Sequence, residues 1–466
     1  MIPLALVAAC IVLQPAKVGE RLRAVSPDEL RANVEALSNF GTRHTLSDTT
    51  SPTRGIGAAR EWIKTRFESY NPPGGSLRVE FEELKVPPGI RVPNGATVVN
   101  VVATLPGTRP ESVRRLYYIV GHYDSRNHEA LDASGDAPGA NDDASGTAAV
   151  LEAARVLAAH PLESTIVFLC TAGEEQGLLG AKGHAENLAA RNGPRVWGVL
   201  SNDIVGDPLG ELAIPAARVM AKKHAGKPLT AEEDELVASA KEARRVVRVF
   251  SEGLPRTSDP QALSRIRSNS AEYDSPSRQI ARYIASIAEL ERTDVQPRII
   301  YRPDRFLRGG DHSAFNEAGF AGVRFTVPHE DYSRQHVGVT ERDGVPYGDL
   351  ASFVDAEYLA GVTRLNLAAL IHMANAPSTP ANARINTKQL ETGTTIRWER
   401  SPETDTAGYE VVWRDTTDWQ WRHVKDAGNS TELILPLSKD NVFFGVRAYD
   451  TDGFRSPVAF TMDSRE

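Results

Sequence analysis

The feature that most constrains the fold is a buried strand pattern that ends abruptly in polar residues. Residues 118–120 are aromatic or β-branched, and His122 and Asp124 follow almost at once. A buried parallel strand presents polar side chains only where it emerges, and the functional crevice of an open α/β sheet lies beyond the carboxyl ends of its strands. This stretch therefore predicts an α/β sheet, and a histidine with a carboxylate at its edge is a typical start of a metal site.

A second segment, residues 138–146, continues the same pattern. It places an acidic pair, Asp142 and Asp143, between glycines and at the start of an alanine-rich helical stretch. Glycine and alanine allow a sharp backbone turn. We expect this turn to aim a single carboxylate, that of Asp142, into the site.

Strand and helix patterns alternate over much of the chain. Amphipathic helices are predicted from Pro27, behind an N-cap at Ser26, and over residues 55–70. Further strand patterns cover residues 79–84, 98–103, 165–170, 196–200, 246–250 and 322–326. This alternation predicts an α/β fold with a mostly parallel mixed sheet and helices on both faces.

Two segments depart from the alternation. Residues 207–245 look like an insertion, because their helical patterns are charged and poorly amphipathic. From residue 380 to 466 the helical patterns stop, and short alternating strands follow one another at the spacing of a β-sandwich. The tryptophan of an early strand, Trp398, and the late strand 443–449 resemble a fibronectin type III module. Such a module carries no catalytic inventory, so we expect it to act in spacing or in docking to a surface or another protein.

The chain begins with an apolar segment over residues 1–16, which is too short to span a bilayer and resembles an export signal peptide. Cys10 offers an alternative, a lipoprotein processing site. No later segment approaches the roughly 20 apolar residues of a membrane helix. We therefore expect a secreted or periplasmic protein whose α/β domain covers residues 17–376.

Charge and cysteine content narrow the chemistry. The net charge is −8 and the basic residues are dispersed, so no stripe for nucleic acid is formed. Cys10 and Cys170 are the two cysteines of the sequence, which excludes a thiolate cluster. Metal ligands have to be His, Asp and Glu.

Imidazoles and carboxylates follow several of the predicted strands and meet at one sheet edge. Each alone could be a helix cap or a packed histidine, but their mutual repulsion together calls for a cation. The set exceeds the three protein ligands of one catalytic zinc and suits two ions that share a carboxylate. Oxygen and imidazole donors fit zinc best, with manganese or cobalt as substitutes. The set comprises His122, Asp142, Glu174, Glu175, Asp203 and His336.

Glu174 and Glu175 should point to opposite sides of an extended segment, so one should bind metal and the other accept a proton from the attacking water. The residue pattern does not say which. Asp124 either holds the second nitrogen of the His122 imidazole or caps a turn, and we favour the first role.

Several ordered motifs over residues 30–375 resemble the secreted di-zinc aminopeptidases. They are His122-x-Asp124, Asn141-Asp-Asp-Ala-Ser-Gly146, Gly173-Glu-Glu-x-Gly-Leu-x-Gly180, Asn202-Asp-Ile204 and Gly309-Gly-Asp-His312, with a late histidine. The resemblance implies the zinc exopeptidase fold. It also implies that two zinc ions bind His122, Asp142, Glu175, Asp203 and His336, with Asp142 bridging, and that Glu174 is the general base. We count Asp124 with Glu174 among the catalytic residues.

One of the assigned ligands departs from the family pattern. His336 stands in Tyr332-Ser-Arg-Gln-His336 rather than in the Tyr-His-Thr setting of many relatives, so His329 is its competitor. Asp311 and His312 match a motif without a derivable ligand role, and we expect a helix cap and a packed histidine.

The resulting prediction is an exported metallo-aminopeptidase that acts on peptides with a free N-terminus. Two enzymes of the same fold are alternatives: a glutaminyl cyclase, which needs one zinc, and a carboxypeptidase for acidic C-terminal residues, for which Arg302, Arg305 and Arg308 would be suited. A third alternative is a catalytically inactive binding or adhesion protein whose β module is the working part.

Overall fold

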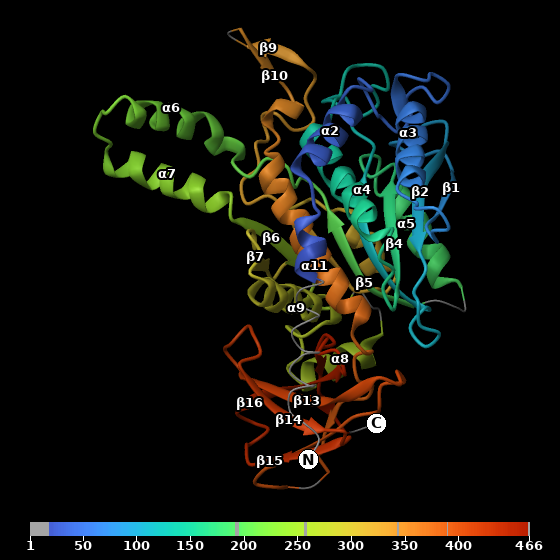
Figure 1. The fold of residues 1–466 in the computed structure, drawn as a ribbon, viewed down its shortest axis with the longest axis vertical. Coiled ribbons are helices and arrows are strands. Elements are labelled where there is room, and N and C mark those ends of the chain that lie inside the picture. The colour runs from blue at the N-terminus through green and yellow to red at the C-terminus, as the bar shows by residue number, and fades with distance from the viewer. Residues whose placement is uncertain (1–17, 192–194, 256–258, 343, 389, 465–466) are drawn as a thin grey trace.

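The computed structural model describes residues 18–464, apart from 192–194, 256–258, 343 and 389. The expected signal segment 1–16 and Cys10 lie outside the described residues. Figure 1 shows an α/β part with a smaller all-β part below it. Among the helices of the described chain, none has both the length and the apolar character that crossing a bilayer requires.

An eight-stranded mixed sheet forms the centre of the α/β part. Its central strands β4, β3, β5 and β8 run parallel, β2 and β1 add antiparallel at one edge, and β6 pairs antiparallel with β8 and parallel with β7. The predicted mixed sheet is thus confirmed. Its strands are β1 (Arg78–Val86), β2 (Ala96–Leu105), β3 (Arg115–His122), β4 (Thr165–Thr171), β5 (Arg195–Asn202), β6 (Val246–Ser251), β7 (Gln296–Ile300) and β8 (Gly322–Thr326).

Helices cover both faces of this sheet because its central strands are apolar on both. In β3, Tyr117 and Ile119 join the larger core, whereas Tyr118 and Val120 join the smaller one. The larger core packs against α2 (Pro27–Ser38), α3 (Gly55–Ser69), α4 (Ser145–Leu157), α9 (Pro276–Glu291) and α11 (Ala356–Asn375). The smaller core packs against α5 (Leu179–Ala189) and α10 (Asp311–Glu317).

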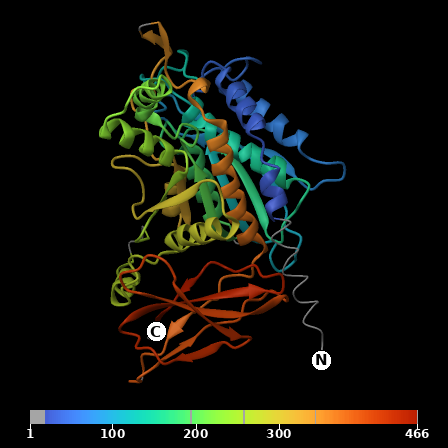
Figure 2. The same ribbon diagram turned by 60° about the vertical axis from the view of Figure 1, so that its left-hand side comes forward.

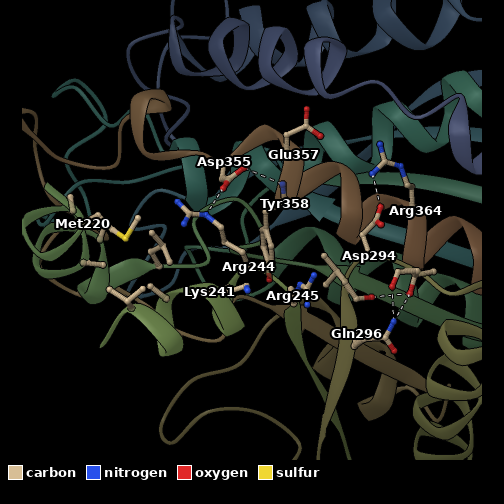
Figure 3. Close-up of a pocket in the computed structure, with 18 of the residues that line it drawn as sticks. Met220, Lys241, Arg244, Arg245, Asp294, Gln296, Asp355, Glu357, Tyr358 and Arg364 are labelled. Carbon is tan, nitrogen blue, oxygen red and sulfur yellow. Dashed lines mark hydrogen bonds and ion pairs between the residues drawn. The ribbon is translucent and has the colours of Figure 1, made fainter. Parts of the chain in front are cut away.

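The segment expected as an insertion forms a helical hairpin that projects from the α/β part, at the left of Figure 1. After the short helix Gly210–Leu212 come α6 (Ala213–His224) and α7 (Ala231–Ala243), and few of their side chains are buried. A cavity of about 960 Å³ lies where the hairpin meets α11 (Figure 3). Ion pairs of Arg244 with Asp355 and of Arg364 with Asp294 cross its wall.

The C-terminal part consists of two four-stranded sheets around a core of its own. Their orders are β15-β12-β11-β18 and β14-β13-β16-β17. Trp398 packs on Tyr409 across this core, with ring centroids 5.7 Å apart. The strands are β11 (Arg384–Ile385), β12 (Thr394–Arg397), β13 (Thr406–Asp415), β14 (His423–Gly428), β15 (Glu432–Leu435), β16 (Val442–Asp450), β17 (Ala459–Phe460) and β18 (Met462–Asp463). The expected all-β module is confirmed, while its assignment to the fibronectin type III class stays a prediction.

Buried ion pairs fasten the β module to the α/β part, beneath α9 in Figure 2. Asp274 contacts Arg282 of α9 and Arg414 of β13, each at 2.7 Å, and all three side chains are almost fully buried. Arg115 and Glu403 form a second buried pair at 2.8 Å. The module is therefore packed against the rest of the chain, which differs from a freely tethered spacer.

Candidate metal centre

Parallel strands bring the predicted site residues to one edge of the sheet. His122 ends β3, Glu174 and Glu175 follow β4, and Asp203 follows β5. Because β4, β3 and β5 are neighbours, their carboxyl ends open into the same crevice. Asp142 enters it from the turn before α4.

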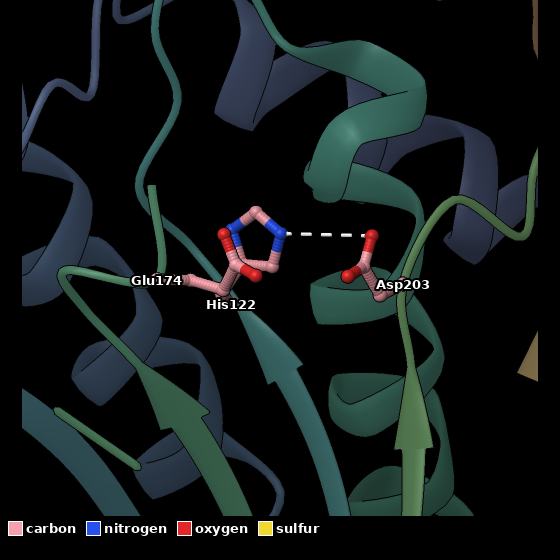
Figure 4. Close-up of side chains that lie close together, drawn as sticks. All are labelled: His122, Glu174 and Asp203. Atoms are coloured by element: carbon pink, nitrogen blue, oxygen red, sulfur yellow. Dashed lines mark ion pairs between the residues drawn. The ribbon is translucent and has the colours of Figure 1, made fainter. Parts of the chain in front are cut away.

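The side chains form two groups. Ligand atoms of His122, Glu174 and Asp203 lie within 4.8 Å of one another, as do those of Asp142, Glu175 and His336. Figure 4 shows the first group around the imidazole of His122. The structure thus brings together every residue that the sequence analysis assigned to metal, and it adds Glu174 to the first group.

Asp142 joins the two groups. Its Oδ1 lies 3.2 Å from His122 Nε2, and its Oδ2 lies 2.9 Å from His336 Nε2. One carboxylate therefore faces both groups, which is the arrangement that a bridging ligand requires.

The turn that carries Asp142 is held from several directions. The carboxylate of Asp349 accepts hydrogen bonds from the main-chain N–H groups of Asn141 and Asp142, both at 2.8 Å. Gly139 has a φ of +48°, and a Cβ there would lie 2.5 Å from the Asp142 carbonyl oxygen. Asp143 points away and accepts from the N–H groups of His122 and Gly146. A glycine-dependent turn was expected from the sequence, but the role of Asp349 was not.

The unpaired atoms of this centre fit a pair of divalent cations. Within the described chain, His122 Nε2, His336 Nε2 and Glu175 Oε1 are buried and make no well-formed hydrogen bond, although anionic oxygens surround the two nitrogens. Buried polar atoms without partners are rare and often mark an ion site. The donor set of imidazole and carboxylate, without thiolate, is one that suits zinc.

Comparisons with known proteins agree with this geometry. Residues 100–266 match the model of peptidase family M28. A probable zinc metalloprotease of Pyrenophora teres f. teres is 41% identical over 456 residues, which make up 96% of this chain and 88% of that protein. The chain belongs to peptidase family M28. Another probable zinc metalloprotease, from Leptosphaeria maculans, is 40% identical over 446 residues, covering 95% of this chain and 96% of its own.

Among solved structures, LapB from Legionella pneumophila is similar to this M28 chain with a TM-score of 0.49. The sequence identity is 18%, and the match covers 76% of this chain and 74% of LapB.

Asp124 serves the site of this M28 peptidase in two ways. His122 Nδ1 lies 3.1 Å from the Asp124 main-chain oxygen but 3.5 Å from its carboxylate. The carboxylate also accepts hydrogen bonds from the N–H groups of Glu174 and Glu175, both at 3.2 Å, and from Thr45 Oγ1 at 2.9 Å. Asp124 therefore contacts the second nitrogen of the imidazole, as expected, most closely through its main-chain oxygen and also through its carboxylate, and the same carboxylate anchors the glutamate pair.

Asp203 has a partner that the sequence analysis missed. Arg324, fully buried in β8, lies 3.0 Å from Asp203 Oδ2 and 2.9 Å from Asp304 Oδ2. Burial raises the pKa of Asp203, but the Arg324 guanidinium and the His122 imidazole outweigh it and hold that pKa below its ordinary value of 3.8. The available signal was an arginine in the middle of an otherwise apolar strand.

Two further polar residues contact the second group without having been predicted. Arg126 Nε lies 3.1 Å from Glu175 Oε2, and its Nη2 lies 2.8 Å from His336 Nδ1. Gln335 Nε2 donates to Asp142 Oδ2 at 2.6 Å. Arg126 follows the His122-x-Asp124 motif and Gln335 precedes His336, but neither belongs to a motif. Only the tertiary contacts show that they touch the site.

The competitor His329 and the motif histidine His312 lie outside the two groups. His329 belongs to neither group, whereas His336 Nε2 lies 2.9 Å from both Asp142 and Glu175. His312 Nε2 contacts the Pro303 carbonyl at 2.8 Å, as a packed histidine would. Asp311 is the first residue of α10, and Gly310 occupies the N-cap position, so the expected cap is corrected: Asp311 accepts from Thr171 Oγ1 instead.

Proposed function

We propose that this M28 chain is an exported metallo-aminopeptidase that removes N-terminal residues from peptides with two co-catalytic zinc ions. The observation that carries the proposal is the position of Asp142, whose two oxygens face histidines of two different groups. A site for a single ion would not require a carboxylate whose two oxygens face two separate groups of ligands. The relatives named as probable zinc metalloproteases support zinc as the metal.

Each proposed ion would have its own ligands and share Asp142. His122 and Asp203 would hold one ion, and Glu175 and His336 the other. When bound, such ions polarise a scissile carbonyl and lower the pKa of the attacking water. The free amine of the substrate would dock against the same acidic centre.

Glu174 is proposed as the general base. It lines the cavity beside Asp203 and Asp142, and the Asp124 carboxylate fixes its main chain. From this position its carboxylate accepts a proton from the attacking water and passes it to the leaving amine. Asp124 acts through Glu174 and is thus a positioning residue.

Export rests on the apolar segment 1–16. The N-terminus of the secreted protein tests this point by mass spectrometry. A mature chain that begins near residue 17 is expected, and one that retains Met1 contradicts removal of a signal peptide.

The activity is tested with one peptide in two forms, with a free and with an acetylated N-terminus. The zinc-loaded protein should shorten the free form stepwise from its N-terminus and leave the acetylated form intact, as followed by mass spectrometry. Chelation should stop the reaction and zinc should restore it. Trimming of both forms from the C-terminus would contradict the proposal, and cyclisation of an N-terminal glutamine without release of an amino acid would favour the glutaminyl cyclase.

A further inference from the structure

We propose that three cations at the mouth of the candidate metal centre form a subsite for a carboxylate of the peptide substrate. These residues, Arg91, Lys182 and Arg308, are called the cation rim below. The inference rests on the proposed function and adds a substrate class to it: peptides that carry a carboxylate within about one residue of the scissile bond.

The cation rim is assembled from three separate parts of the chain. Arg91 lies in the loop between β1 and β2, Lys182 lies on α5, and Arg308 lies in the loop between β7 and α10. All three line one cavity of about 490 Å³ whose wall also includes Asp142 and Glu174. Three unrelated elements thus present like charges to the space in which the substrate would bind.

Two members of the rim are connected to the candidate ligands by hydrogen bonds, one directly and one through a single intervening side chain. Arg91 Nη1 donates to the main-chain oxygen of Glu175 at 3.1 Å. Arg308 Nη1 donates to Gln335 Oε1 at 3.1 Å, and Gln335 in turn donates to Asp142. A group held by these guanidiniums would therefore belong to the residue at the scissile bond or to its neighbour.

The charges of the rim are not compensated by the protein. Other cations of the same cavity have acidic partners: Arg305 contacts Glu330 at 2.5 Å, and Arg126 contacts Glu175. No carboxylate of the described residues lies within ion-pair distance of a rim side chain, and Arg308 rests instead 5.1 Å from the ring centroid of Tyr332. Like charges that face one cavity without a counterion favour an anionic ligand.

The charge balance of the site points the same way. Asp142, Glu174, Glu175 and Asp203 line the cavity and carry four formal negative charges, which two divalent cations would cancel. The rim then leaves the cavity positive. A basic side chain of the substrate would be repelled at the rim, whereas a carboxylate would be attracted.

The carboxylate could come from the side chain of an acidic N-terminal residue or from the C-terminus of a very short peptide. Two substrate pairs distinguish these sources. Glu-Ala-Ala-amide against Gln-Ala-Ala-amide tests the side chain, and Leu-Ala against Leu-Ala-amide tests the C-terminus. With the zinc-loaded full-length protein, the acidic member of at least one pair should have a KM lower by about five- to tenfold, with a similar kcat, and added salt should reduce the difference.

Variants of the rim connect this preference to named residues. Arg308→Gln and Arg91→Gln should each raise the KM of the acidic member about threefold or more relative to the KM of its neutral partner. Arg302→Gln is the matched control, because Arg302 belongs to the same loop as Arg308, stacks on Phe306 at 3.8 Å and does not line the cavity. This control should keep the full preference.

The outcomes separate the inference from the proposed function. Hydrolysis without preference in either pair, or equal loss for both members in the variants, overturns the cation rim and leaves the aminopeptidase standing. If no peptide is hydrolysed, the proposed function fails. The cation rim is then tested by calorimetry, which measures the affinity of the Glu174→Gln protein for the two members of each pair. Tighter binding of the acidic peptide that Arg308→Gln weakens supports the subsite, and equal binding of acid and amide overturns it.

Discussion

Glu174 and Glu175 are adjacent in the chain, yet their carboxylates face different groups of the candidate metal centre. Asp124 maintains this divergence by accepting hydrogen bonds from both main-chain N–H groups. The sequence analysis expected opposite orientations from an extended segment. The structure corrects that premise: the two glutamates lie in a bend and a turn after β4, where the N–H groups of Gly177 and Leu178 donate to the Glu174 carbonyl, and this turn sets the divergence. The choice between ligand and base depends on the position of each carboxylate in the cavity, which the sequence does not contain.

Replacing Glu174 by Gln separates the two roles. The amide cannot accept the proton of the attacking water, so kcat should fall by about a hundredfold or more. Bound zinc, measured by atomic emission, should remain as in the unmodified protein, because Glu174 is not among the proposed ligands. Retained activity, or the loss of one zinc equivalent, would refute the assignment of Glu174 as base. Glu175→Gln, which removes a proposed ligand, should lose zinc and serves as the comparison.

The buried ion pairs of Arg324 are expected to contribute to the free energy of unfolding. Its guanidinium lies between the buried carboxylates of Asp203 and Asp304. Arg324→Met removes this cation from both carboxylates and leaves Asp304 with Arg305, at 3.2 Å, so the free energy of unfolding of the metal-free protein should fall by about 3 kcal/mol. Added zinc should recover part of the loss, since it supplies a positive charge to Asp203. Denaturant titration measures both effects.

The exposed Arg302 again provides the control for that experiment. Arg302→Met should change the free energy of unfolding by less than about 0.5 kcal/mol. A loss of similar size in both variants would mean that the Arg324 ion pairs do not stabilise the site.

At the scale of elements, the sequence predicted the strands whose side chains are buried on both faces. β3, β4 and β5 each contain an apolar run, and the polar residues at the ends of β3 and β5 located His122 and Asp203. β7 (Gln296–Ile300) was missed because, unlike the edge strand β1, its five residues include a proline and do not alternate between apolar and polar. Its existence depends on pairing with β6, which is a tertiary event.

The same reason explains the residues missed at the site. Asp349, Arg126 and Gln335 stand in segments without a periodic pattern, and they become functional candidates only because the chain folds them against Asp142 or Glu175. Local motifs located His122, Asp142 and Glu174. His336 could be named only with His329 as a competitor, because no strand or helix fixes the register of that loop.

Asp450, at the end of β16, should make the free energy of unfolding depend on pH. Its Oδ1 accepts from the Phe454 N–H at 2.8 Å, while its Oδ2 is buried without a hydrogen bond. Burial, together with Asp405 and Asp452, raises the pKa of Asp450 to about 7. An unfolded aspartate has a pKa of about 3.9, so between these values the folded state binds more protons and the free energy of unfolding falls as pH rises.

Asp450→Asn removes this titration and keeps the acceptor for Phe454. The variant should therefore be more stable than the unmodified protein at pH 8, and its advantage should shrink progressively toward pH 4. Thermal unfolding at several pH values measures the difference between the two proteins. Asp440→Asn, at an exposed position of the same module, should show no such trend. A pH-independent difference for Asp450→Asn would contradict the raised pKa.

At the scale of the whole molecule, the α/β part and the β module share buried charges. Asp274 is the common partner of Arg282 and Arg414, and Tyr283 of α9 donates to the Arg455 carbonyl at 2.7 Å. Buried polar contacts of this kind cannot form with either part alone. We therefore expect the two parts to unfold in one transition.

Asp274→Ala tests this coupling. It leaves two arginines buried without a counterion, so the free energy of unfolding should fall by about 3–5 kcal/mol. Calorimetry should also show the module unfolding before the α/β part. Asp294→Ala removes a more exposed partner of Arg364 and should cost less than about 1 kcal/mol. Equal small effects of the two substitutions would show that the parts are independent.

The central claim is that one carboxylate, Asp142, joins two ion sites. Calorimetric titration of the chelator-stripped protein with zinc, checked by the metal content after dialysis, tests it most directly. Two zinc equivalents per chain are predicted, with one equivalent lost in His336→Ala and both bound more weakly in Asp142→Ala. A single equivalent in the unmodified protein, undiminished in His336→Ala, would contradict the account.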